Sequence, residues 1–106
     1  MDKALQQLRQ FRDARDWQQF HNPKDLAMAL SIEASELLEA FLWKRPEAAD
    51  PLKIREELAD VFAYALLLSD ACGLDPETIV LEKIAKNAEK YPVDKARGSA
   101  RKYTEL

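Results

Sequence analysis

Hydrophobic residues recur at helical spacing along most of the chain, and proline or glycine separates one hydrophobic segment from the next. No segment alternates hydrophobic and polar residues in the way that a half-buried strand does. We therefore predict an all-α fold with four helices. They cover about residues 2–16, 23–43, 51–72 and 76–91.

Capping signals support these boundaries. A capping residue precedes a proline at Asn22-Pro23, Asp50-Pro51 and Asp75-Pro76, which is typical of the start of a helix. Gly73 is expected to cap the C-terminal end of the third helix, and Lys44-Arg45-Pro46 is expected to end the second.

Composition limits the size of the fold and its partners. With 106 residues and 47% hydrophobic content, we predict a single domain over residues 1–106, of which residues 93–106 form a basic tail. Because a small helical domain buries a limited share of its surface, we expect a homo-oligomer. The net charge of -3 provides no basic field for a nucleic-acid polymer.

The compartment is predicted from what the sequence lacks. It shows no signal-peptide pattern, and no apolar run approaches the ~20 residues that span a bilayer. We expect a soluble, cytoplasmic protein without a membrane partner. The single cysteine, Cys72, excludes an internal disulfide framework, and we expect its thiol to be buried.

Two acidic pairs, Glu33 with Glu36 and Glu57 with Asp60, carry the candidate chemistry. Residues three positions apart lie on one side of a helix, so two facing helices would bring four carboxylates together. Such carboxylates repel and raise each other's pKa unless a cation lies between them. A hard divalent cation with oxygen ligands is the simplest solution.

Helical-wheel positions favour a metal site over a solvated acidic surface. At about 100° per residue, Glu33 falls within the hydrophobic stripe of its helix, and Glu57 lies beside the stripe of the next helix. Asp60 directly precedes the apolar run of residues 61–68, which we expect to be buried. Because an isolated buried charge costs several kcal/mol, these carboxylates need a partner or a metal.

The ligand types indicate which metal. Carboxylate oxygens suit Mg²⁺, with Mn²⁺ as a possible substitute, whereas zinc favours His and Cys, of which the chain has one each. A di-iron carboxylate bundle needs Glu-x-x-His pairs, and the only histidine, His21, lies in a predicted loop. No Ser-His-Asp or Cys-His set is evident, so water is the expected nucleophile.

The acidic pairs and the segment between them resemble the signature of the MazG-like, all-α nucleoside triphosphate pyrophosphohydrolases. Three further segments, at residues 15–26, 41–44 and 83–92, are similar to the dCTP pyrophosphatase branch of that family. The resemblance implies a four-helix bundle that associates through helix faces as a dimer or a dimer of dimers. It also implies hydrolysis between the α- and β-phosphates, which gives a nucleoside monophosphate and pyrophosphate.

The resemblance further implies roles for individual residues. The implied catalytic metal ligands are Glu33, Glu36, Glu57 and Asp60. The resemblance leaves open which of them activates the water, and we favour Glu36 because it lies toward the edge of its hydrophobic stripe. The implied triphosphate ligands are Lys83 and Asn87, which share a helix face, together with Lys95, Arg97 and Lys102 of the tail. The implied base and sugar residues are Trp17, His21, Trp43 and Tyr64, with Phe20 nearby.

Several alternatives remain open. The substrate could be dUTP, dATP or a damaged nucleotide instead of dCTP or a related pyrimidine deoxynucleotide. A helical interaction module that binds a basic partner protein is a rival of another class, although carboxylates on an apolar seam disfavour it. The sequence does not determine the number of metal ions, the choice between dimer and tetramer, or whether subunits share the site.

Overall fold

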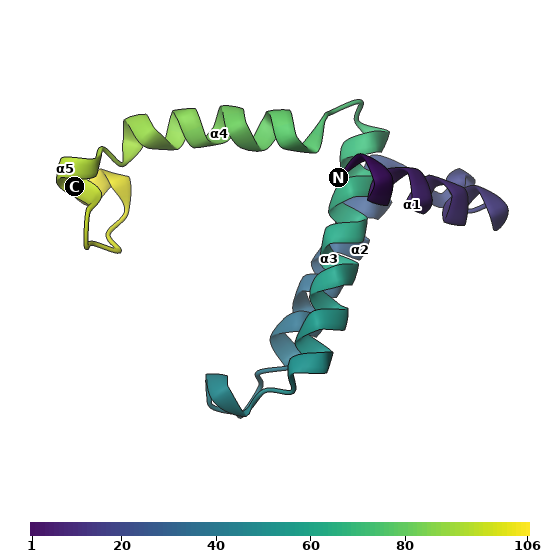
Figure 1. The fold of residues 1–106 in the computed structure, drawn as a ribbon, viewed down its shortest axis with the longest axis horizontal. Helices are drawn as coiled ribbons and strands as arrows, with labels where there is room; N and C mark the ends of the chain where they lie inside the picture. Colours follow the sequence, from purple (N-terminus) through teal and green to yellow (C-terminus); the bar gives the residue numbers. More distant parts are fainter. The chain divides into compact units, whose positions relative to one another are not determined.

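The computed structural model describes all 106 residues and contains helices but no strands, which confirms the all-α prediction (Figure 1). The four long helices are α1 (Asp2–Ala14), α2 (Pro23–Glu39), α3 (Pro51–Ala71) and α4 (Pro76–Lys90). A short helix, α5 (Val93–Ala96), and three 3₁₀ turns, η1 (Gln18–Phe20), η2 (Pro46–Ala48) and η3 (Tyr103–Glu105), complete the chain. None of these helices combines the length and the apolar character needed to cross a bilayer.

Side-chain caps start the helices at the predicted positions. The Asn22 side chain accepts a hydrogen bond from the backbone N–H of Asp25 at the start of α2, over 2.9 Å. Asp50 and Asp75 cap α3 and α4 in the same way. Gly73 adopts a φ of 68° just beyond α3, which is the left-handed conformation predicted for its C-terminal cap.

The second helix is shorter than predicted. It ends at Glu39 instead of near Trp43. Over the next residues the backbone N–H groups bond three residues back, as in the pairs Leu42 to Glu39 and Lys44 to Phe41. Trp43 itself has a φ of 61°, which no α-helix accommodates, and so the helical pattern cannot continue through it.

The chain divides into two compact units, residues 1–74 and 75–106. In the first unit, α2 and α3 pack along each other, and α1 contacts α3 (Figure 1). The hydrophobic residues buried in this unit are Leu26, Ala40, Ala49, Leu66 and Leu67. The core therefore lies between α2 and α3, where the acidic pairs also lie.

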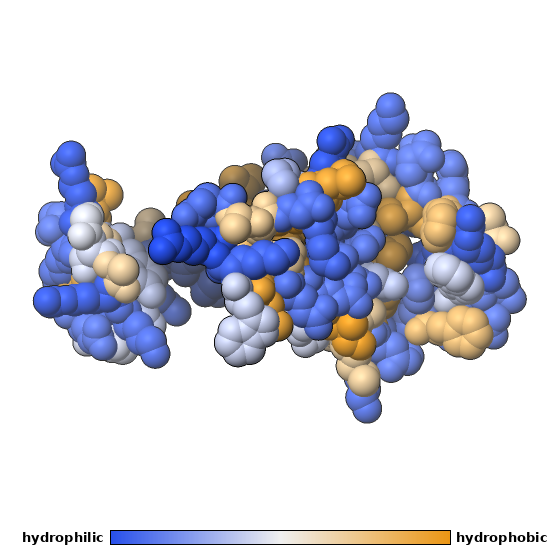
Figure 2. Space-filling model, turned by 90° about the horizontal axis from the view of Figure 1, so that it is seen from below, coloured by the Kyte–Doolittle hydropathy of each residue, from blue (hydrophilic) through white to orange (hydrophobic).

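Much hydrophobic surface stays accessible, and hydrophobic side chains stand among charged ones on the face drawn in Figure 2. The prediction that residues 61–68 are all buried is wrong, because Phe62 is 53% exposed. Phe62 instead lines an open groove of about 900 Å³ together with residues of α1, among them Ala4 and Leu8. The prediction of a buried Cys72 is also wrong, because this residue follows the last turn of α3 and is exposed.

The second unit contains α4, α5 and η3, so the predicted tail is partly helical. Tyr103 packs edge-on against Tyr91, with ring centroids 6.0 Å apart, and the Lys90 ammonium lies 4.8 Å from the Tyr103 ring centroid. These contacts fold the end of the chain onto the end of α4.

Candidate functional site

Three carboxylates meet between α2 and α3. Oxygen atoms of Glu33, Glu36 and Glu57 all lie within 4.8 Å of one another. Glu33 and Glu36 are one turn apart on α2, and Glu57 faces them from α3. Glu33 and Glu57 each bury one oxygen that has no hydrogen-bond partner. As its helical-wheel position predicts, Glu33 points between the helices.

The crowding of these groups disfavours their charged forms. Burial raises the pKa of Glu33 to about 7, and Glu36 adds to the effect by hydrogen bonding and by charge. Burial and Glu36 raise the pKa of Glu57 as well, while the nearby Lys53 opposes that shift. The salt bridges of the chain lie elsewhere, at Arg9 and Arg12, so none of them neutralises this cluster.

This donor set suits a hard divalent cation. All ligand atoms are carboxylate oxygens, which Mg²⁺ and Mn²⁺ prefer, and no thiol or imidazole belongs to the group. The unpartnered buried oxygens of Glu33 and Glu57 are the atoms that a cation would satisfy. The cluster can therefore hold a metal ion.

The fourth predicted ligand, Asp60, lies at the edge of the cluster. It follows Glu57 by about one turn of α3 and is exposed. Its charge raises the pKa values of both Glu33 and Glu57, so it lies within electrostatic reach of them. The structure thus brings three predicted ligands into one group and leaves Asp60 beside it.

Asp60 also lines a pocket of about 240 Å³. The lining residues are Leu8, Phe11, Arg12, Trp17, His21, Asp60, Ala63, Tyr64 and Leu67. Three residues predicted to contact a base or sugar, Trp17, His21 and Tyr64, therefore share one pocket. The pocket is small compared with the ≈ 300–1,000 Å³ of drug-sized sites, and it suits a single flat ring with aromatic neighbours.

A tight turn after α1 brings Trp17 to the pocket. Asp16 has a φ of 55°, and the backbone N–H of Trp17 donates to the carbonyl of Arg12 over 3.1 Å. The N–H of Asp16 donates to the carbonyl of Asp13, which completes a Schellman-type helix end. Trp17 then packs edge-on against Phe11, with ring centroids 5.8 Å apart.

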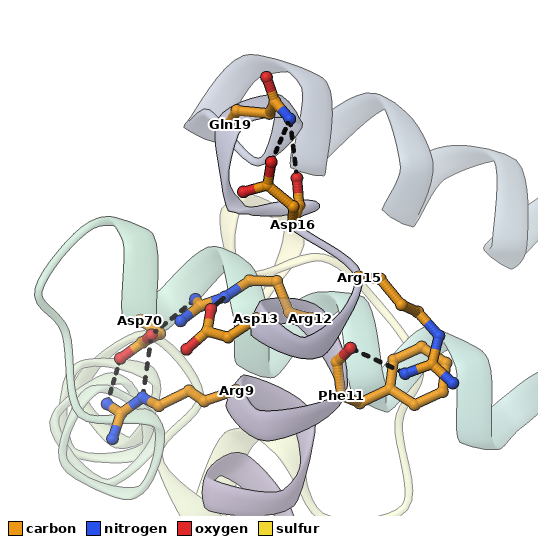
Figure 3. A network of polar contacts seen from close by, with 8 residues as sticks. All are labelled: Arg9, Phe11, Arg12, Asp13, Arg15, Asp16, Gln19 and Asp70. Atoms are coloured by element: carbon orange, nitrogen blue, oxygen red, sulfur yellow. Dashed lines mark hydrogen bonds and ion pairs between the residues drawn. The ribbon is translucent and has the colours of Figure 1, made fainter.

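Neighbouring polar groups hold this turn in place (Figure 3). The Arg15 guanidinium carbon lies 3.5 Å from the ring centroid of Phe11, and its Nη1 donates to the Phe11 carbonyl over 2.9 Å. The Gln19 amide donates to the carbonyl and to the carboxylate of Asp16, over 2.9 and 3.0 Å. Arg15 and Gln19 therefore help to hold Phe11 and the turn before Trp17 in place.

Two side chains of basic residues, His21 and Arg12, share the pocket with Asp60. The Nδ1 atom of His21 is buried and has no hydrogen-bond partner. Burial, and then the charge of Arg12, lower the pKa of His21, so its imidazole is neutral at neutral pH. The side chain of Arg12 is only 13% exposed.

An ion-pair network at the end of α3 holds Arg12. Its Nε donates to Asp13 over 2.8 Å, and its Nη1 lies 3.5 Å from the Asp70 carboxylate (Figure 3). Arg9 donates to the same carboxylate through Nε, over 3.1 Å, and through Nη2. Asp70 therefore ties one face of α1 to α3.

The remaining predicted residues lie outside this pocket. Trp43 is 95% exposed, and it does not line the pocket that contains Trp17. In the second unit, Lys83 and Asn87 lie one turn apart on α4, as predicted, with Lys83 exposed and Asn87 half-buried. Lys95 lines an open cavity of about 830 Å³ within that unit, together with residues 98–101, 105 and 106. Arg97 and Lys102 are exposed and do not line this cavity.

Arg12 is the pocket residue that sequence reasoning missed. A signal for it exists, because Arg12 follows Leu8 by four residues and Leu5 by seven. It therefore belongs to the hydrophobic stripe of α1, and a charge on such a stripe needs an explanation. The same criterion pointed to Glu33 and would have pointed to Arg12.

Comparison with known proteins adds independent information. The sequence model of the MazG-like family matches residues 28–106. The chain is 42% identical to dCTP pyrophosphatase 1 of Rattus norvegicus and to that of Homo sapiens. Each alignment covers 92% of this chain but 62% of the relative, so the chain spans less than two thirds of the length of these mammalian relatives.

A solved structure is also similar. The crystal structure of a pyrophosphatase from Archaeoglobus fulgidus matches with a TM-score of 0.81 and 42% sequence identity. The match covers 87% of this chain and 92% of the archaeal one. The fold described above is therefore one that an experimentally determined pyrophosphatase also adopts.

Proposed function

The chain belongs to the MazG-like family, and on that basis we propose that it is a Mg²⁺-dependent nucleoside triphosphate pyrophosphohydrolase. The proposed substrate is dCTP or a related pyrimidine deoxynucleotide, and the products are the monophosphate and pyrophosphate. The names of the mammalian relatives support this choice of nucleotide. Such an activity would serve nucleotide-pool housekeeping in the cytoplasm.

One observation carries the proposal: Asp60 lines the pocket and also lies within electrostatic reach of the carboxylate cluster. A ligand with its ring against Trp17 would therefore extend toward Glu33 and Glu57. A nucleotide has this form, with a flat base at one end and phosphates that bind divalent metal at the other. An acidic face made for a basic protein would not need the aromatic pocket.

The proposed metal ligands are Glu33, Glu36, Glu57 and Asp60, and the proposed metal is Mg²⁺ or its substitute Mn²⁺. When bound, the metal would neutralise phosphate charge and polarise the α-phosphorus for attack by water. Without that positive charge, the cluster and a triphosphate would repel each other, since both are anionic.

One carboxylate of the cluster is also suited to orient the attacking water. Glu36 lies within hydrogen-bonding reach of both Glu33 and Glu57, so it is the central carboxylate of the three. We assign it the role of orienting the attacking water and accepting its proton. Attack at the α-phosphorus breaks the bond to the α–β bridging oxygen, and pyrophosphate leaves with that oxygen.

The pocket supplies the base site in this proposal. Trp17 would stack on the base, and His21 and Tyr64 would contact the edge of the base or the sugar. Trp43 is 95% exposed and does not line the pocket. A contact with the base would therefore require the Trp43 side chain to move toward a base that is bound in the pocket. Lys83, Asn87, Lys95 and Lys102 are the proposed ligands of the triphosphate, because they offer the cations and the amide that phosphate oxygens bind.

The experiment that tests this function is pyrophosphate release from a panel of canonical and modified nucleotides in the presence of Mg²⁺. We expect dCTP or a related pyrimidine nucleotide to give the highest kcat/KM. Glu33→Gln and Asp60→Asn should each lower kcat/KM by at least roughly 10–100-fold. That is the usual loss when a residue that only hydrogen-bonds a metal ligand is replaced, and the loss of a ligand itself should be no smaller. Glu39→Gln is the matched control, because Glu39 is an exposed carboxylate at the end of α2 outside the cluster.

Other results would redirect the proposal. A preference for dUTP, dATP or a damaged base would keep the reaction and change the substrate. No pyrophosphate release from any nucleotide, with no thermal stabilisation by Mg²⁺ and nucleotide, would favour the helical interaction module.

We also propose that the chain assembles as a homodimer or a dimer of dimers. Large hydrophobic side chains are exposed on the two helices that form the acidic cluster, including Met28, Ile32, Leu58 and Phe62. Covering this surface would stabilise an assembly by roughly 25 cal/mol for each Å² of apolar area removed from water. Light scattering coupled to gel filtration distinguishes monomer, dimer and tetramer.

A further inference from the structure

Arg12 is a cation in a pocket that is otherwise mostly aromatic and aliphatic. Its side chain is 13% exposed, and its Nε and Nη1 atoms are directed to Asp13 and Asp70. No hydrogen bond or ion pair within the chain involves its Nη2 atom. At least the two N–H groups of Nη2 are therefore available to a ligand, and a second N–H of Nη1 lies beside them.

A guanidinium can only donate hydrogen bonds, and it does so as a rigid fork. The ring atoms that such a fork binds best are two adjacent acceptors, as in the bidentate pairing of arginine with guanine. Cytosine offers this arrangement in its O2 and N3 atoms. Uracil and thymine do not, because their N3 carries a hydrogen that would face another donor.

His21 cannot make the same distinction. Its Nδ1 is buried without a partner, and a neutral imidazole presents either a donor or an acceptor there, depending on its tautomer. It can therefore accept from the amino group of cytosine or donate to the O4 atom of uracil. Of these two side chains, only Arg12 is restricted to donating hydrogen bonds.

We propose that Arg12 is the specificity-determining residue of this pocket, and that its guanidinium selects cytosine over uracil and thymine by donating to the O2 and N3 atoms of the base. The proposal rests on the proposed function, because it places the base of the nucleotide in the pocket of Trp17. Asp70 acts as a positioning residue, since it holds the guanidinium through Nη1.

The chain contains a matched control for a structural role. Arg9 binds the same Asp70 carboxylate as Arg12 but does not line the pocket. If Arg12 served only to tie α1 to α3, Arg9→Gln and Arg12→Gln would have similar effects. If Arg12 reads the base, only Arg12→Gln changes base selectivity, because glutamine can both donate and accept.

The test compares wild type, Arg12→Gln, Arg12→Met and Arg9→Gln. It measures kcat/KM for dCTP and dUTP, and also binding of deoxycytidine and deoxyuridine by calorimetry without metal. We expect the dCTP/dUTP ratio to fall about tenfold or more in Arg12→Gln, and to stay near the wild-type value in Arg9→Gln. Arg12→Met should also lower the ratio, mainly because kcat/KM for dCTP falls. Thermal unfolding identifies any variant that fails to fold.

The remaining outcomes are distinct. A dCTP/dUTP ratio of kcat/KM that stays unchanged in Arg12→Gln, whether or not both values fall, would overturn the role of Arg12. The pyrophosphohydrolase activity would still stand. A wild-type protein that prefers deoxycytidine through Arg12 but hydrolyses no nucleotide would support the role of Arg12 and contradict the proposed function.

Discussion

Glu33 of α2 and Glu57 of α3 lie with carboxylate oxygens within 4.8 Å of each other, and each buries one oxygen that has no hydrogen-bond partner. Two like charges in this position repel, and burial removes the water that would screen them. The metal-free protein is therefore strained at the centre of its main helix pair. Binding a cation there converts the repulsion into attraction.

Above pH 7, where Glu33 is charged, replacing it by glutamine should raise the melting temperature of the metal-free protein by a few degrees. The substitution keeps the size of the side chain and removes one of the mutually repelling charges. The same variant should lose the stabilisation by Mg²⁺ that we expect of the wild type. Thermal unfolding with and without Mg²⁺ measures both effects, and a variant that Mg²⁺ still stabilises as it does the wild type would exclude Glu33 as a ligand.

The stability of the metal-free protein should depend on pH in an unusual direction. Folded, Glu33 keeps its proton up to about pH 7, whereas in the unfolded chain it releases the proton near its ordinary pKa of 4.5. The folded state holds more protons between these values, so the free energy of unfolding should decrease as the pH rises through this window. Urea denaturation at several pH values tests the sign, and Glu33→Gln should weaken the trend.

Metal affinity should show the opposite trend. A cation must displace the proton of Glu33, so below pH 7 Mg²⁺ affinity should rise by about tenfold for each pH unit and then level off. Calorimetric titrations with Mg²⁺ across this range give the slope. A flat dependence would show that the metal binds without displacing a proton from the cluster.

Local signals explain why the helix starts could be predicted. Asn22, Asp50 and Asp75 each cap the helix that follows through contacts within three residues, so sequence neighbours suffice to recognise them. The end of α2 depends instead on the positive φ of Trp43, which no glycine announces. Sequence reasoning therefore extended that helix too far.

The candidate site divides in the same way. Helical periodicity alone placed Glu33 on the inner side of α2, because that argument needs only the helix itself. The pocket depends on contacts between distant segments, such as Arg9 with Asp70, which lie 61 residues apart. Such a contact cannot be deduced from one segment. The hydrophobic stripe of α1 marks Arg12 as an unusual charge, but only contacts between segments show that it lines a pocket with Trp17 and His21.

Removing the Asp70 carboxylate should destabilise the first unit. Hydrogen bonds from Arg9, and then the arginine charges, lower the pKa of Asp70, so its stabilising effect is present above its ordinary pKa of 3.8 and is lost on acidification below it. At neutral pH, Asp70→Asn should lower the free energy of unfolding by roughly 1–2 kcal/mol. Urea denaturation measures this change. Glu39→Gln is the control. An equal change in the free energy of unfolding for both variants would show that the ion pairs of Asp70 do not stabilise the first unit.

The two tryptophans should respond differently to a nucleotide. Trp17 lines the pocket beside Phe11, whereas Trp43 is 95% exposed. Because stacking of a base on an aromatic side chain is worth about 1–3 kcal/mol, Trp17→Leu should raise KM for dCTP roughly tenfold or more, and Trp43→Leu should raise it less. The fluorescence of the Trp43→Leu protein, which then comes from Trp17, should change when the nucleotide is added. Equal increases in KM for both variants would mean that Trp43 encloses the base as fully as Trp17 does.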